Sequence, residues 1–487
     1  MSRRGTGAGL AALAAAILSA GPAAAQQTPA PTEPAAPPQA AKPAAPPTPV
    51  RVYLPNPADE DWSFLADKSL RIDFWDPLKY IPLGDGGQFM TLSGEVRFRP
   101  EGLRIRGVGE RPTTTDNYLL QRYLFGADVR LSKRVRVFAE LQSGIINGRL
   151  GSPRPTDKNT LDVHQGFVEW LPVLQPARRL RVKVGRQELA IGSTRLISAS
   201  PGLNVKRAFD GVTFGYTSKP FNVSAAVAEL VNVSGGAFDD HPEREQLFWG
   251  FAASRRSPRF QRGELGAYYL GIDRKRSLFA QGIGPEQRHT VGLGWNGIGR
   301  RFDINWDALY QWGSFADASI GAWAFATESG VRFPDARWTP RVAIRTDIAS
   351  GDKDRFNPTL QSFNPLFPGN SYSGAVGLLG PTNLTDLTPA VTLRPRRNLA
   401  VGVEMPTYWR TSTGDGVYGT DQRLIVPPQA GEGKFVGMNP GVVVVYQATR
   451  HLQVQGAITR FLSGGFLERT FVAKGFGFYS ATAQYRF

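Results

Sequence analysis

Apolar and polar residues alternate with a period of two over most of the chain after Phe89. The run 90–99 shows the alternation clearly, because Leu92 and Val96 fall on one face and Glu95 and Arg97 on the other. Successive side chains of a strand point to opposite faces of a sheet. The pattern therefore predicts strands that carry one apolar and one charged face.

The same alternation recurs along the chain, for example in residues 119–131, 135–142, 304–312 and 342–348. We count roughly 18 candidate strands, many of them about 9–12 residues long, which suits a tilted strand that crosses a bilayer. No later window holds an apolar run long enough for a transmembrane helix. A soluble sandwich alternates too, but the number and length of these strands favour a membrane barrel.

Short turns, such as residues 131–134 and 217–220, alternate with long segments such as residues 350–384. This asymmetry is typical of outer-membrane barrels, which have short periplasmic turns and long outer loops. The sheet must close, because an open edge in lipid would leave backbone groups without hydrogen-bond partners. The sequence thus predicts an all-β fold, a transmembrane antiparallel β-barrel of about 18 strands over residues 89–487.

Three segments precede the predicted barrel. Residues 1–25 have the charged start, apolar middle and small-residue end of a secretory signal peptide. Residues 26–50 are rich in Ala and Pro and predict an extended linker. Residues 51–88 hold several aromatic residues among prolines and predict a periplasmic plug segment at the barrel rim. Cysteine is absent, so the chain has no disulfide and no thiolate metal ligand.

The charge balance bears on what the barrel would carry. The chain has 57 Lys and Arg against 41 Asp and Glu, a net charge of +16. A charge on the lipid side near the midplane costs about 2–4 kcal/mol, so the charged face must line the interior. A positive interior concentrates anions and repels cations. The residues expected to line the pore are Arg97, Arg122, Arg130, Arg136, Arg186, Arg195, Arg207, Arg341, Arg345, Asp128, Glu140 and Asp347.

Arginine suits an acidic polysaccharide, because its planar guanidinium matches a carboxylate with two parallel hydrogen bonds. Transport also requires release, so many modest contacts serve it better than one tight site. The alternative for each single arginine is structural, in that it pairs with an interleaved acid and fills the barrel. Arg181 and Lys183 belong to the same charged face.

Several stretches resemble the alginate export family of outer-membrane barrels. They are GRQEL at 185–189 with RAFDGV at 207–212, RIDFWDPLKYIPLG at 71–84, the run 362–389 and the ending 461–487. The resemblance implies a passive porin for export of an alginate-like polyuronate, with the segment after residue 350 occluding the pore. It also implies a monomer in the outer membrane of a Gram-negative cell and export partners in the periplasm.

An uptake porin for small acidic nutrients or oligosaccharides is the main alternative, since it needs the same anion path. The four histidines show no ligand or catalytic spacing, so we expect no enzyme, no cofactor and no metal site. The run 351–354 faintly matches a calcium loop but lacks its glycine and distal glutamate. Nucleic-acid binding is excluded by the signal peptide, despite the sequence pI of about 10.1.

Overall fold

The computed structural model describes residue 51 and residues 53–103, 115–256, 262–369, 377–428, 433–470 and 475–487. The chain divides into two compact units, residues 1–50 and residues 51–487. The predicted signal peptide and linker lie outside the described residues and stay predictions. None of the helices in the described part combines the length and hydropathy that a membrane span needs.

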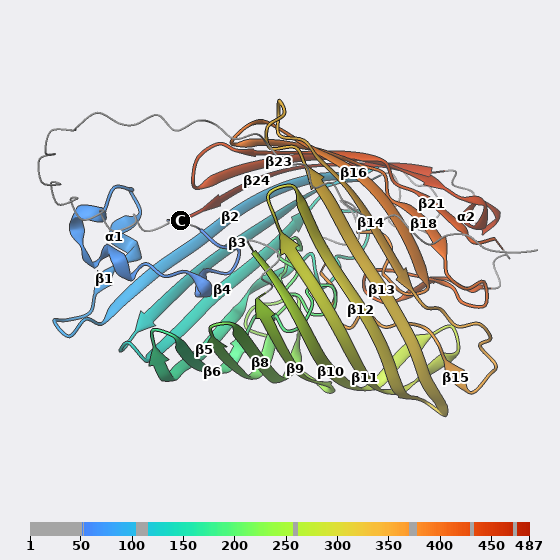
Figure 1. Ribbon diagram of the computed structural model, residues 1–487, viewed down its shortest axis with the longest axis horizontal. Coiled ribbons are helices and arrows are strands. Elements are labelled where there is room, and N and C mark those ends of the chain that lie inside the picture. The colour runs from blue at the N-terminus through green and yellow to red at the C-terminus, as the bar shows by residue number, and fades with distance from the viewer. Residues whose placement is uncertain are drawn as a thin grey trace, which may run out of the picture. The chain divides into compact units, whose positions relative to one another are not determined.

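Residues 89–487 form one closed antiparallel barrel of 18 strands, as predicted (Figure 1). The first strand pairs with the last, which closes the sheet. Two strands consist of two pieces each, β17 with β18 and β21 with β22, because proline interrupts the ladder at Pro406 and Pro440.

The barrel strands in chain order are β2 (Phe89–Leu103), β3 (Asp116–Arg130), β4 (Val135–Asn147), β5 (Asn159–Gln175), β6 (Arg178–Gln187), β7 (Phe209–Ser218), β8 (Phe221–Asn232), β9 (His241–Arg256), β10 (Arg262–Phe279), β11 (Gly282–Ile298), β12 (Phe302–Phe315), β13 (Ala318–Arg332), β14 (Arg341–Ala349), β16 (Leu384–Arg396), β17 (Leu399–Glu404), β18 (Thr407–Arg410), β21 (Phe435–Met438), β22 (Gly441–Gln447), β23 (Leu452–Ser463) and β24 (Gly475–Arg486). The remaining elements are the 3-10 helices η1 (Pro57–Asp59), η2 (Ser63–Ala66) and η3 (Lys68–Leu70), the helices α1 (Asp76–Lys79) and α2 (Gly465–Thr470), and the short strands β1 (Ile81–Pro82), β15 (Thr359–Leu360), β19 (Val417–Tyr418) and β20 (Leu424–Val426).

The two rims of the barrel differ. One rim carries the short connections, among them residues 131–134, 176–177 and 219–220. The other carries the long ones, among them residues 188–208 and 350–383. The segment 51–88 pairs with the start of β2 through β1, so it lies at the rim of the short connections. Short turns face the periplasm in outer-membrane barrels, and we therefore expect this rim to be the periplasmic one.

The distribution of buried residues is the reverse of that in a soluble protein. Along β2 the polar side chains of Thr91, Glu95 and Arg97 are buried, whereas Phe98 is 41% exposed. The outward face of β12 likewise exposes Tyr310. On these strands charged groups point into the barrel and apolar groups point out of it, which is the arrangement that hydrocarbon around the barrel requires.

Two long loops fold into the barrel and meet there. The β6–β7 loop, residues 188–208, and the β14–β16 loop, residues 350–383, join through a parallel bridge between Ile197 and Phe367. The amide of Phe367 donates to the carbonyl of Leu196 at 2.8 Å, and that of Ser198 donates to the carbonyl of Phe367 at 3.0 Å.

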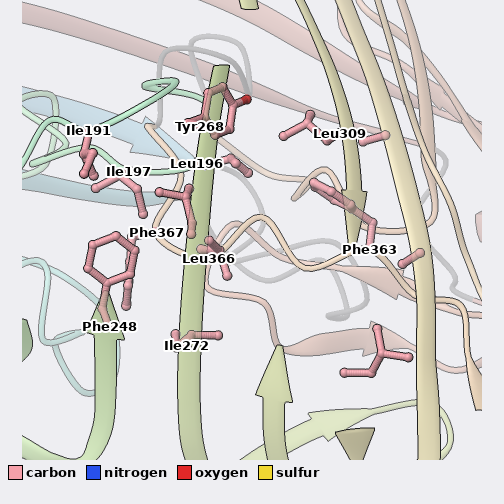
Figure 2. Packing of buried hydrophobic residues seen from close by; sticks show 14 of the residues in the cluster. Ile191, Leu196, Ile197, Phe248, Tyr268, Ile272, Leu309, Phe363, Leu366 and Phe367 are labelled. Atoms are coloured by element: carbon pink, nitrogen blue, oxygen red, sulfur yellow. The ribbon is translucent and has the colours of Figure 1, made fainter. Parts of the chain in front are cut away.

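An apolar cluster forms where these loops reach the barrel wall (Figure 2). Leu366 and Phe367 of the β14–β16 loop pack with Ile197 against the inward side chains of Phe248 and Ile272 on β9 and β10. All five are at most 3% exposed. The interior is therefore closed on this side by apolar packing, and the polar space lies elsewhere.

Candidate transport path

A cavity of about 1030 Å³ is lined by the inward faces of β6–β13, at the ends of these strands that join the short connections, and by residues 190 and 192–194 of the β6–β7 loop. Small and polar side chains such as Ser224, Ser254 and Asn296 supply much of its lining. Its described charged residues are Arg181, Arg256, Arg332, Glu264, Asp303, Asp307 and Glu328. The three guanidinium groups face four carboxylates, so this vestibule carries no positive excess.

A second cavity of about 290 Å³ shares Arg181 and Thr194 with the vestibule and is also lined by Lys183 and Glu188. Asn56 of the N-terminal segment lines it as well. Arg181 has the most accessible cationic side chain here, 43% exposed and 3.8 Å from the nearest carboxylate oxygen, on Glu169. Both cavities end against the β6–β7 loop.

Four of the predicted pore arginines hold carboxylates along the inner wall. Arg136 lies between Asp128 and Glu169, at 3.1 and 3.0 Å. Arg130 contacts Asp128 at 3.3 Å and Asp61 of the N-terminal segment at 3.5 Å. The other two pairings of this kind are Arg341 with Asp303 and Glu328, and Arg345 with Asp347 and Asp386. These guanidinium groups are engaged within the wall.

Three predicted arginines hold the β6–β7 loop in place. Arg97 donates to the carbonyl of Leu203 at 2.7 Å. Arg122 donates to the same carbonyl at 2.7 Å and to Glu95 at 2.7 Å. Arg195, within the loop, pairs with Asp307 at 3.2 Å and Asp347 at 2.9 Å. The wall arginines thus fix the loop by charge-assisted hydrogen bonds, which are short and directional.

Arg186 lies on the other side of the wall. It is two residues beyond the outward-facing Val184 and opposite Gly166, so it shares the outward face of β6. Its guanidinium makes a bidentate pair with Asp210 of β7 at 2.9 and 3.0 Å. Arg186 therefore does not belong to the inner face that would carry a transport path.

The structure joins the predicted pore residue Glu140 to three groups that the site prediction did not include, in a buried charge cluster beside the second cavity. Glu188 contacts His164 at 3.1 Å and the ammonium of Lys206, and Glu140 lies 3.9 Å from His164. Burial alone would raise the pKa of Glu188, but Lys206 and His164 lower it to about 2. Lys206 also donates to the carbonyl of Pro55 at 3.3 Å.

The three ligand-type groups of this cluster, on Glu140, His164 and Glu188, lie within 4.8 Å of one another. The ammonium of Lys206 already neutralises the Glu188 carboxylate, which makes the cluster an ion-pair network and not a cation cage. It ties the N-terminal segment, the wall and the β6–β7 loop together. Residue type alone gave no signal, because the four partners are far apart in the sequence.

Arg207 differs from the other predicted arginines. Within the described part of the chain it makes no ion pair, and its guanidinium donates to the carbonyls of Ser198 at 2.9 Å and Phe367 at 2.7 Å. Arg274 of β10 lies on the same aromatic ring: the two guanidinium carbons are 5.6 and 5.4 Å from the ring centre of Phe367. Burial, together with Arg274, lowers the pKa of Arg207 to about 10.

Comparisons with known proteins bear on the identity of the barrel. A family model described as alginate export matches residues 89–474. No curated protein sequence matches the chain.

Solved porin structures share the fold at low identity. Pseudomonas aeruginosa OccK2 (OpdF) in complex with glucuronate is 11% identical with a TM-score of 0.53, covering 82% of this chain and 97% of its own. A BenF-like porin from Pseudomonas fluorescens Pf-5 is 9% identical with a TM-score of 0.55, covering 82% and 98%. Acinetobacter baumannii OccAB2 is 9% identical with a TM-score of 0.55, covering 84% and 99%.

The family match spans most of the chain and agrees with the earlier resemblance. Together with the closed 18-strand barrel it identifies an outer-membrane porin of a Gram-negative cell, a channel by both family and fold. The chain belongs to the alginate export family.

Proposed function

We propose that this porin passively exports an acidic polysaccharide of the alginate type along an anion-selective path. One observation carries the proposal: Arg207 and Arg274 lie against the same ring of Phe367, and each donates to a backbone carbonyl of the β14–β16 loop. Undocking of that loop would present both guanidinium groups to the interior.

A uronate carboxylate fits the position that the loop now fills. Arg207 is bound there by the carbonyl of Phe367, and Arg274 reaches the carbonyl of Leu366 at 3.4 Å. A carboxylate offers the same two guanidinium groups a charged acceptor in place of neutral carbonyls, and charge-assisted hydrogen bonds are about twice as strong as neutral ones. The nearest carboxylate to Arg274 is Glu286, at 3.7 Å, which it shares with Arg288.

The lack of a positive excess in the vestibule is compatible with an anion-selective path. The vestibule carboxylates Asp303 and Glu328 are held by Arg341, and Asp307 is held by Arg195, so the wall there is close to neutral. A neutral polar entrance admits a long polymer without trapping it, and conduction requires weak binding at many sites. The selective step would then lie deeper, at Arg207 and Arg274.

The test uses planar bilayers and a barrel whose β14–β16 loop has been shortened by removal of residues 352–369. In a salt gradient we expect an anion-selective reversal potential and block by mannuronate oligomers from the periplasmic side. Arg207→Gln should move the ratio of anion to cation permeability toward unity and weaken the block by mannuronate oligomers. Arg300→Gln is the matched control, because Arg300 is 70% exposed at a short turn. A cation-preferring pore, or one that ignores the oligomers, would refute the proposal.

The alternative is uptake of small acids such as single uronates. The structure of OccK2 (OpdF) in complex with glucuronate, which shares this fold, favours considering it. The two functions differ in direction and in substrate length. Liposome flux of monomers against oligomers separates them: faster flux of glucuronate with no block by oligomers would favour uptake.

A further inference from the structure

Two large apolar side chains stand out from the N-terminal segment, outside the barrel strands. Ile72 is 72% exposed and Phe74 is 84% exposed, the latter the most exposed large apolar side chain in the described residues. They lie in the turn between η3 and α1. Neither has a place in the core of residues 51–88, so another surface must cover them or they face water.

The turn that presents these side chains is fixed by a buried carboxylate. Asp76 accepts hydrogen bonds from the amides of Ile72 and Asp73 at 2.7 and 2.8 Å and pairs with Arg51 at 2.6 Å. Asp73 in turn accepts from the amide of Trp75 at 3.0 Å. The backbone is held by these contacts, so Ile72 and Phe74 cannot turn inward without breaking them.

Trp75 connects this turn to the outer wall of the barrel. Its ring stacks on Phe487 with centroids 4.2 Å apart, and its indole N–H donates to the hydroxyl of Tyr485 at 2.7 Å. Phe74 meets the ring of Trp75 edge-on at 5.0 Å. The aromatic turn is therefore continuous with the end of β24.

Tyr485 and Phe487 belong to the face of β24 that points outward. Arg486 between them points inward, where it pairs with Glu95 at 2.9 Å. The ring of Phe487 lies over Gly94, which shares the outward face of β2 with Phe98. The support beneath Trp75 is thus the periplasmic end of the lipid-facing wall.

We propose that Ile72, Phe74 and Trp75 insert into the phospholipid leaflet on the periplasmic side of the outer membrane. Aromatic and apolar groups beside a transmembrane wall favour the membrane interface, where Trp is enriched. Polar contacts of the same turn point to the aqueous rim, since Asp73 pairs with Arg450 at 3.3 Å and His451 at 3.0 Å. The turn would thereby anchor the N-terminal segment at this rim of the barrel.

The absence of native cysteine allows a direct test. A nitroxide is attached at Phe74→Cys, with Lys68→Cys as an exposed polar control and Phe98→Cys as a lipid-facing reference. In phosphatidylethanolamine and phosphatidylglycerol liposomes, the label at 74 should collide with oxygen as the label at 98 does and be shielded from a water-soluble nickel chelate. Equal nickel access at 74 and 68 would overturn the proposal. Dipolar broadening at 74, which reports a second copy, would overturn it too.

A second measurement does not depend on labelling. Phe74→Ser should leave the barrel folded, because the side chain is exposed, and should speed proteolysis of residues 51–88 in liposomes several-fold while leaving the rate in detergent unchanged. Lys68→Ser serves as the control, and an unchanged rate in liposomes would contradict the anchor. The outcome does not affect the proposed anion path, which rests on other residues.

Discussion

The two sides of the barrel interior differ in the kind of contact that dominates: ion pairs on one side and apolar packing on the other. On the side of β2–β6, inward charges such as Arg122 and Glu95 pair with each other and bind the β6–β7 loop. On the side of β8–β13, inward apolar groups such as Phe248 and Ile272 pack against the β14–β16 loop. Arg288 and Gln311 add hydrogen bonds to carbonyls of the same loop, at 3.1 and 2.7 Å. Charged contacts are directional and costly to leave unpaired, whereas apolar contacts tolerate rearrangement. From this comparison we predict that the first loop is a fixed part of the wall and that the second loop is the part that moves.

Removing the moving loop should have the largest effect. Deletion of residues 352–369 takes away the apolar plug and the carbonyls that occupy Arg207 and Arg274. We expect single-channel conductance to rise from near closed to that of an open pore, measured in planar bilayers. Conductance that stays near zero would show that the β6–β7 loop closes the barrel by itself.

Breaking the charged side should cost stability and leave conductance low. Arg122→Ala removes a partner of Glu95, whose side chain is only 5% exposed. Loss of one member of a buried pair typically costs about 3–5 kcal/mol. Denaturant unfolding in detergent measures the loss. Arg300→Ala, which breaks an exposed pair, should cost about 0–1 kcal/mol, and equal losses would contradict the assignment.

Weakening the apolar side should open the pore without unfolding it. Phe367→Ala removes a buried ring from the docking surface, at a cost of about 3 kcal/mol, the lower end for such a change. The ratio of undocked to docked loop should rise about a hundredfold, seen as longer open times in single-channel recordings. Phe356→Ala is the control on the same loop, since Phe356 is 82% exposed and should change little.

A smaller effect should come from pH. Burial raises the pKa of Asp352, at the base of the moving loop, to about 6, with Asp415 and Asp354 nearby. Once undocked, its pKa returns to about 3.9, so the docked loop binds the proton more tightly. Docking is therefore strongest below about pH 4 and weakens as pH rises to about 6. Open probability should increase over that range and then level off.

The control for this titration is a substitution that leaves no group to ionise. Asp352→Asn should flatten the pH dependence of open probability between pH 4 and 6. Asp421→Asn, at an exposed site in the neighbouring loop, should keep it. A wild-type profile that falls with rising pH would contradict the sign of the coupling.

The sequence predicted the barrel well, because alternation along runs such as 90–99 is enforced by lipid on one side and water on the other. It did not predict the apolar side of the interior. The run 247–251 is apolar on both faces, so alternation alone does not separate its lumen face from its lipid face, and Phe248 faces the lumen. Strands with two apolar faces lose the signal that distinguishes inside from outside.

Individual site residues were harder to predict than the face they belong to. Alternation from Val184 already places Arg186 outward, but its place in a basic stretch suggested the lumen. The partners of Glu188 and the shared ring of Arg207 and Arg274 depend on loops that return from distant parts of the chain. The spacing of residues in the sequence does not predict these contacts, because they form only when the loops dock inside the barrel.

Glu95 receives one arginine from each neighbouring strand, Arg122 from β3 and Arg486 from β24. One neighbour is made early in synthesis and the other last. Before β24 pairs with β2, the Glu95 carboxylate has only Arg122 as an ion-pair partner. Trp75 then also lacks the ring of Phe487 on which it stacks. Pairing of β24 with β2 therefore completes the charge compensation of Glu95, which an unclosed sheet would leave with Arg122 alone.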